Sequence, residues 1–157
     1  MKYSRLTKEQ FEELREEFIN FLATQSITGD EWEAIKKNKP ETAEQELDVF
    51  SDLVWLGVLT KVKYLEHISP NQIHLFECNE KSMRLIALRI ENEYVDFTTK
   101  EGFNWLRDNL LSDSFEFFNA KKDYSDDKHL DIFKMIQSGA SITKGELFNY
   151  FSNLVKG

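Results

Sequence analysis

The change of hydrophobic period in the middle of the chain constrains the fold more than any other feature. Residues 61–91 alternate apolar and polar side chains, as strands do, whereas the stretches on either side follow the period of a helix. Turn-forming residues at 69–72 and 79–82 divide the alternating stretch into three segments. Neighbouring strands joined by such short turns pair antiparallel. The sequence therefore predicts a three-stranded antiparallel meander between two groups of helices.

The two turns also predict the register of the meander. If each turn closes symmetrically, His67 lies opposite His74 and Glu77 lies opposite Arg84. One face of the sheet is then rich in isoleucine and leucine, and we expect helices to cover it. Its members are Val62, Tyr64, Ile68, Ile73, Leu75, Ile86, Leu88 and Ile90. The other face carries Leu65, His67, His74, Phe76, Cys78, Met83, Leu85 and Ala87.

Capping boxes mark the starts of several predicted helices. In this motif Thr is followed three residues later by Glu or Gln. The motif begins at Thr7, Thr28, Thr98 and Thr143, and the last of these pairs with Glu146. The helical period predicts three helices before the meander, over about residues 7–24, 29–37 and 40–59. It predicts three more after the meander, over about residues 99–110, 126–137 and 144–155, with residues 115–118 in a polar loop. The predicted fold class is α+β, with three N-terminal helices, the three-stranded meander and three C-terminal helices.

The length of the chain, 157 residues, is that of one ordinary domain. No stretch resembles a flexible linker, so the sequence predicts a single compact α+β domain over residues 1–157. The one cysteine, Cys78, cannot form an intramolecular disulfide, and the first residues lack the pattern of a secretory leader. We therefore expect a cytoplasmic protein. Its longest apolar run, residues 53–59, is too short to span a bilayer, so no membrane partner is expected.

The charge of the chain disfavours nucleic acid as a partner. Its 20 Lys and Arg against 28 Asp and Glu leave a net charge of −8, which repels a phosphate backbone. The acidic residues are concentrated between residues 40 and 60, where no Lys or Arg occurs. A protein that acts as an acidic decoy of nucleic acid is a further alternative.

The predicted helix over residues 40–59 carries the candidate partner-binding surface. At 100° per residue, acidic residues lie opposite an apolar stripe, which is formed by Ala43, Leu47, Phe50, Val54 and Val58. Trp55 and Leu59 break this pattern because they fall on the acidic side. If they are exposed beside Asp48 and Asp52, they form an anchor rimmed by charge, which suits a basic protein partner. If a second layer of the fold covers them, they are core residues.

His67 and His74 are the candidate metal ligands. Residues directly opposite each other in an antiparallel pair have Cβ atoms about 5 Å apart, close enough for two imidazoles to share a metal ion. Two ligands do not make a site, and Cys78 lies too far along the strand to complete one. The sequence has no phosphate-binding glycine loop, nucleophile elbow or zinc-protease motif. It therefore identifies no catalytic residue and no cofactor, and two structural histidines are the simpler interpretation.

Five short motifs together resemble a family of small acidic bacterial proteins of unknown function. They are FINFL at 18–22, FSD at 50–52, YLEH at 64–67, YSDD at 124–127 and KGEL at 144–147. The similarity extends over nearly the whole chain, which implies one intact domain. Because the family has no assigned activity, the resemblance implies no catalytic residue.

The leading hypothesis is a non-enzymatic protein–protein interaction module that binds a protein partner or a second copy of itself. The alternative is a small enzyme or metal-binding protein that uses His67 and His74. The sequence leaves open whether the protein is an enzyme, and the absence of a catalytic motif favours the first hypothesis.

Overall fold

The computed structural model of the chain describes residues 1–110 and 112–156. The chain divides into two units, Met1–Thr60 and Lys61–Gly157. Across the described residues the fold is α+β, with seven helices and five strands, so the predicted class is confirmed and the predicted number of elements is not. The expectation of one compact domain over residues 1–157 stays a prediction.

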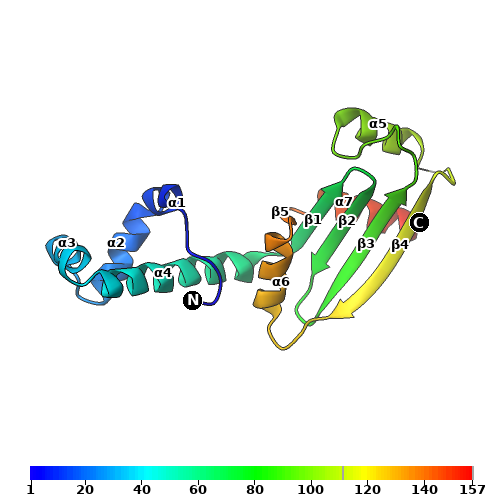
Figure 1. Cartoon of the computed structure of the whole chain (residues 1–157). Coiled ribbons are helices and arrows are strands. Elements are labelled where there is room, and N and C mark those ends of the chain that lie inside the picture. The colour runs from blue at the N-terminus through cyan, green and yellow to red at the C-terminus, as the bar shows by residue number, and fades with distance from the viewer. Residues whose placement is uncertain (111, 157) are drawn as a thin grey trace. The chain divides into compact units, whose positions relative to one another are not determined.

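The first unit is built from four helices: α1 (Lys8–Glu13), α2 (Arg15–Thr24), α3 (Gly29–Asn38) and α4 (Pro40–Lys61) (Figure 1). The capping boxes that begin at Thr7 and Thr28 are confirmed. The single helix predicted over about residues 7–24 is wrong, because the backbone leaves helical geometry at Leu14, where φ is −101° and ψ is 25°. α1 and α2 are therefore separate helices joined at this residue.

Aromatic rings fill the core of the first unit. The ring centroid of Phe18 lies 5.0 Å from that of Phe50, 5.3 Å from that of Trp32 and 5.8 Å from that of Phe11. All three contacts are edge-to-face, a geometry that adds about 0.5–1.5 kcal/mol to the stabilisation from burial. Phe50 is buried, as the stripe predicted for α4 requires, whereas Val58 of the same stripe is exposed.

The second unit is built around an antiparallel sheet (Figure 1). Its strands are β1 (Tyr64–Ser69), β2 (Gln72–Cys78), β3 (Ser82–Ile90), β4 (Phe115–Asp123) and β5 (Ser141–Thr143), in the order β4-β3-β2-β1-β5. The predicted register of both hairpins is confirmed, since His67 pairs with His74 and Glu77 pairs with Arg84. Strong turn signals on both sides of β2 explain why the sequence was sufficient here.

Two strands were not predicted, so the three-stranded meander is only part of the sheet. β4 covers the residues expected to form a polar loop, and it pairs with β3 along the whole strand. Its sequence FEFFNAKKD does not alternate, because the strand is solvent-exposed on both faces after Phe115. β5 has only three residues, which is too short for a periodic signal.

The Ile-rich face of the sheet carries the core of the second unit, as predicted. Three further helices belong to this unit: α5 (Lys100–Asp108), α6 (Lys128–Gln137) and α7 (Glu146–Lys156). Ile73, Ile86 and Leu88 are fully buried and form one cluster with Leu106 of α5 and Phe148 of α7. In the described parts of the chain, no helix is long and apolar enough to cross a membrane.

The predicted cap of α5 is shifted by one residue, and α6 has a cap outside the predicted set. The cap of α5 is Thr99 rather than Thr98, and its hydroxyl accepts from the N–H of Gly102 at 3.0 Å. The Thr98 hydroxyl instead donates to the carboxylate of Asp96. Asp127 caps α6, with its carboxylate accepting from the N–H of Leu130 at 3.1 Å. Each of these two caps makes a local hydrogen bond that the sequence spacing does not resolve.

Candidate partner-binding surface

The acidic side of α4 is the predicted partner-binding surface, and the structure places the start of the chain along it. We call Glu44, Asp48 and Asp52 the acidic flank, and residues 2–6 the N-terminal segment. Asp52 accepts two backbone hydrogen bonds from this segment, from the N–H of Lys2 at 2.7 Å and from that of Tyr3 at 2.9 Å. The segment, which bends at Tyr3, passes beside α4 before it enters α1 (Figure 1).

Arg5 makes the charged contacts between the N-terminal segment and the flank. Its guanidinium donates to one oxygen of Asp48 through Nε at 2.8 Å and through Nη2 at 2.6 Å. Nη1 donates to the carboxylate of Glu44, and Nη2 also reaches the carbonyl of Glu44 at 3.2 Å. A planar guanidinium suits such multiple contacts better than the point charge of a lysine. The hydrogen bonds to Glu44 and then to Asp48 raise the pKa of Arg5 above its ordinary value, which already lies far above neutral pH.

A buried serine fixes the end of the N-terminal segment. The N–H of Leu6 donates to Ser51 Oγ at 3.1 Å, and Ser51 Oγ donates to the carbonyl of Leu47 at 2.7 Å. Both Leu6 and Ser51 are buried. The contacts move from Asp52 to Asp48 and Glu44 as the segment advances from residue 2 to residue 5. The next residue, Leu6, returns to Ser51, so these contacts fix the segment against α4 without giving it one direction along the helix.

The two apolar residues predicted for this surface are not equivalent. Leu59 is 0% exposed, so its side chain offers no surface to a partner. Trp55 is partly buried, and it shares the acidic side of α4 with Asp48 and Asp52. The exposed apolar residues of α4 are instead Val49, Leu53, Leu56 and Val58. The prediction of an anchor at Trp55 thus stays open, whereas Leu59 lacks the exposure that the predicted role requires.

His67 and His74 face each other across β1 and β2, as the sequence predicted. Burial lowers the pKa of His74, and the neighbouring His67 lowers it further. The His67 ring also lies against the turn after α6, since a Cβ added at Gly139 would sit 3.0 Å from His67 Nε2. Among the residues that the structure describes, no group of three or more His, Cys, Asp or Glu is placed to hold a metal ion. The pair therefore remains a metal-binding hypothesis based on two ligands.

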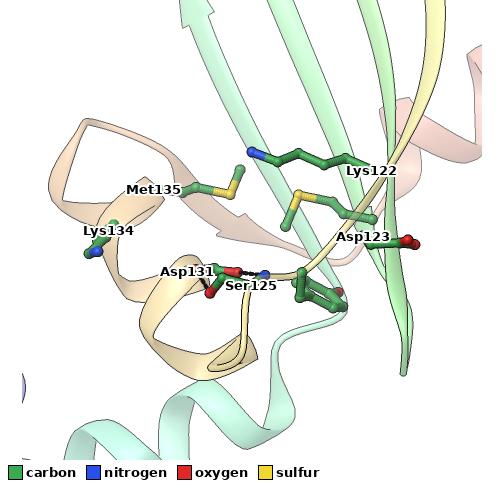
Figure 2. Close-up of a pocket in the computed structure, with 8 residues that line it drawn as sticks. Lys122, Asp123, Ser125, Asp131, Lys134 and Met135 are labelled. Carbon is green, nitrogen blue, oxygen red and sulfur yellow. Dashed lines mark hydrogen bonds between the residues drawn. The ribbon is translucent and has the colours of Figure 1, made fainter.

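A cavity of about 430 Å³ lies between α6 and the end of β4, and the sequence did not predict it. Its lining includes Lys122, Asp123, Ser125, Asp131 and Lys134, so opposite charges are mixed (Figure 2). Ser125 Oγ donates to Asp131 at 2.6 Å, and the N–H of Ser125 donates to the other oxygen of this carboxylate at 2.7 Å. None of the described lining residues is a histidine, so the lining supplies no imidazole that could activate Ser125 as the general base of a Ser-His-Asp triad.

Cys78 is the only thiol of the chain, and its environment makes it a poor nucleophile. Burial raises its pKa to about 11, although Lys128 acts in the opposite direction. A thiol with such a pKa is almost entirely protonated at neutral pH, and the thiolate is the reactive form. Beside it, the Tyr124 hydroxyl donates to the carbonyl of Asn79 at 2.7 Å. This hydrogen bond connects the residue after β4 to the turn between β2 and β3.

The comparisons with known proteins identify a family. A family model described as a family of unknown function, DUF6495, matches residues 1–156. The chain belongs to DUF6495. The resemblance to a family of unknown function over nearly the whole chain is therefore confirmed. No curated protein and no solved structure matches the chain.

Membership in DUF6495 covers both units but assigns no activity, ligand or partner to them. Function must therefore be inferred from the surfaces of the chain itself. The sequence missed the occupation of the acidic flank by the N-terminal segment. The available signal was the charge complementarity between Arg5 and the acidic block that contains Asp48.

Proposed function

We propose that this chain is a non-enzymatic protein–protein interaction module, and that the acidic flank of α4 binds a basic segment of a partner. The observation that supports the proposal is the way the flank holds the N-terminal segment. It receives two consecutive backbone N–H groups at Asp52 and a guanidinium at Asp48 and Glu44. A partner segment with the same chemistry would make the same contacts.

The geometry defines what the partner must offer. Asp52 accepts from two successive main-chain N–H groups, so it requires a backbone that bends to turn both of them to one side, as the chain does at Tyr3, and it places little restriction on the side chains there. Asp48 and Glu44 together receive one guanidinium, which requires arginine two residues after the second of those N–H groups. Trp55, on the same side of α4, supplies partly exposed aromatic surface beside these charges.

The N-terminal segment is then the intramolecular competitor of the partner. A tethered ligand acts at an effective concentration on the order of millimolar, so it masks the flank from a weak free ligand. Its charged contacts are only partly protected from water, since the Arg5 side chain is 33% exposed. Contacts of this kind contribute modestly and weaken with salt. A partner of higher affinity would therefore displace the segment.

A peptide-binding experiment with the full chain tests the proposal. The probe is a fluorescent peptide with the sequence of residues 1–8, titrated against the wild-type chain and against Arg5→Ala. Arg5→Ala removes the competitor's charged contact, so we expect it to bind the probe at least about tenfold more tightly than the wild type does. Binding should weaken modestly as salt is raised.

Two double variants test whether the probe binds at the acidic flank. Arg5→Ala combined with Asp48→Lys should lose the probe, whereas Arg5→Ala combined with Glu17→Lys, an equal charge change at an exposed position of α2, should retain it. Circular dichroism verifies that all variants are folded. Failure of Arg5→Ala to bind the probe, or equal binding by the two double variants, would show that the flank is not a peptide-binding surface.

A further inference from the structure

β4 is an unpaired edge of the sheet in the second unit. In the described part of the chain it pairs with β3 alone, and every residue after Phe115 is exposed. Figure 1 shows β4 along the outer margin of the sheet. The free side of an edge strand carries backbone N–H and C=O groups that can pair with another strand. A nine-residue edge of this kind is long enough to define a specific pairing.

We propose that β4 pairs antiparallel with β4 of a second copy of this chain, across a two-fold axis that passes through Asn119. This interface lies in the second unit and does not depend on the acidic flank. In the register that pairs the whole strand, Glu116 of each copy lies opposite Lys122 of the other. The strand is thus complementary in charge to itself, which a two-fold interface requires.

The charges select this register over its neighbours. A slip of one residue would place side chains from opposite faces of the sheet across from each other. A slip of two residues puts Glu116 opposite Ala120 or Tyr124, so its charge finds no partner. A slip of four residues in one direction places Lys121 opposite Lys121, which is repulsive. Lysines on an edge strand often prevent it from pairing with another strand. Here only the register that pairs the whole strand places a carboxylate, that of Glu116, opposite Lys122.

Apolar surface accompanies the charges on both faces of the edge. On one face, Phe118 is 48% exposed and would lie opposite Ala120 of the second copy. On the other face, Phe117 lines a cavity of about 320 Å³ together with Leu154 and Val155 of α7, which are also exposed. The aliphatic stem of Lys121 from the second copy would lie over Phe117. Pairing therefore buries aromatic surface that the single chain exposes.

Sedimentation velocity over a range of concentrations tests the proposal with charge variants of the full chain. We expect the wild type to form dimers as its concentration rises. Glu116→Lys alone, or Lys122→Glu alone, replaces two attractive pairs by two repulsive ones and should raise the dimer dissociation constant at least about tenfold. The double variant Glu116→Lys with Lys122→Glu restores opposite charges and should recover the affinity to within about threefold. Glu101→Lys, an exposed change in α5, is the charge-matched control and should dimerise like the wild type.

The double variant separates this interface from a general effect of charge or folding. If each single variant weakens the dimer and the double variant does not restore it, the Glu116–Lys122 pairing is wrong. A wild-type chain that stays monomeric up to about millimolar concentration, or a dimer that is indifferent to both single variants, would overturn the proposal entirely.

Discussion

The acidic flank of α4 and the β4 edge are both charged and face solvent, but their polar groups are satisfied in different ways. On the flank, Asp52 and Asp48 accept hydrogen bonds from the N-terminal segment of the same chain. Along β4, Glu116 and Lys122 are exposed, and the proposed pairing gives each of them its complement in a second copy of the strand. A block of charge in a sequence therefore does not by itself indicate a free surface, because residues of the same chain or of a second copy can occupy it.

The largest expected effect tests whether a packed core holds the flank in place. Phe50 is buried on the opposite side of α4 and contacts three other phenylalanines. Phe50→Ala should lower the free energy of unfolding by about 3–5 kcal/mol, because it removes a core ring and leaves a cavity. Val49→Ala, at an exposed position next to it, should change this free energy by less than about 0.5 kcal/mol.

Chemical denaturation followed through the indole NMR signals of Trp32 and Trp105 measures this effect in both units. If the chain is one cooperative domain, as the sequence predicts, Phe50→Ala shifts both signals to the same lower midpoint. A shift of Trp32 alone would divide the chain into two domains. A loss of less than about 1 kcal/mol would show that α4 is not held by this aromatic core.

A smaller effect tests how firmly the N-terminal segment is fixed to α4. Ser51→Ala leaves the N–H of Leu6 without its side-chain acceptor in a buried position, which should cost about 1–3 kcal/mol. Ser138→Ala removes an exposed hydroxyl that bonds to the carbonyl of Lys134, and it should cost less than about 0.5 kcal/mol. Equal effects of the two variants in urea unfolding would mean that the segment is not fixed at Ser51.

The smallest expected effect is a pH dependence of stability that arises from the histidine pair on the sheet. Burial and His67 both lower the pKa of His74, so NMR titration should place His74 below its ordinary value of 6.5. Because the unfolded chain binds this proton more tightly, stability is full above pH 6.5 and falls as the pH drops through the folded pKa. His67→Ala should raise the pKa of His74 only part of the way, since burial is the larger cause.

The same pair decides the metal-binding alternative. If the histidines are structural, elemental analysis of the purified protein should find no stoichiometric zinc, nickel or copper. One metal ion per chain, lost on His74→Ala, would favour the metal-binding function over the interaction module.

The meander could be predicted because its information is local. Each hairpin is closed by strong turn residues, so the pairing of His67 with His74 follows from the sequence between them. The Ile-rich face was also predictable, because residues such as Ile73 and Ile86 recur with the period of a strand and are buried on one side.

The surfaces could not be predicted in the same way, because they depend on contacts between distant residues. β4 lacks alternation and is recognisable as a strand only through its pairing with β3. The burial of Leu59 depends on which residues pack over it. The helical period shows only on which side of α4 the Leu59 side chain lies. The N-terminal segment is irregular and has no periodic signal, so its contacts with Asp48 and Asp52 emerge only from the structure.

Amide hydrogen exchange of the wild-type chain at low and high concentration tests the central contrast between the two regions most directly. We expect the N–H groups of Tyr3 and Leu6 to be protected to the same degree at both concentrations, because their acceptors belong to the same chain. The N–H groups on the free side of β4 should exchange rapidly in the dilute sample and become protected in the concentrated one. Concentration-independent exchange along β4, or unprotected exchange at Tyr3 and Leu6, would contradict the account.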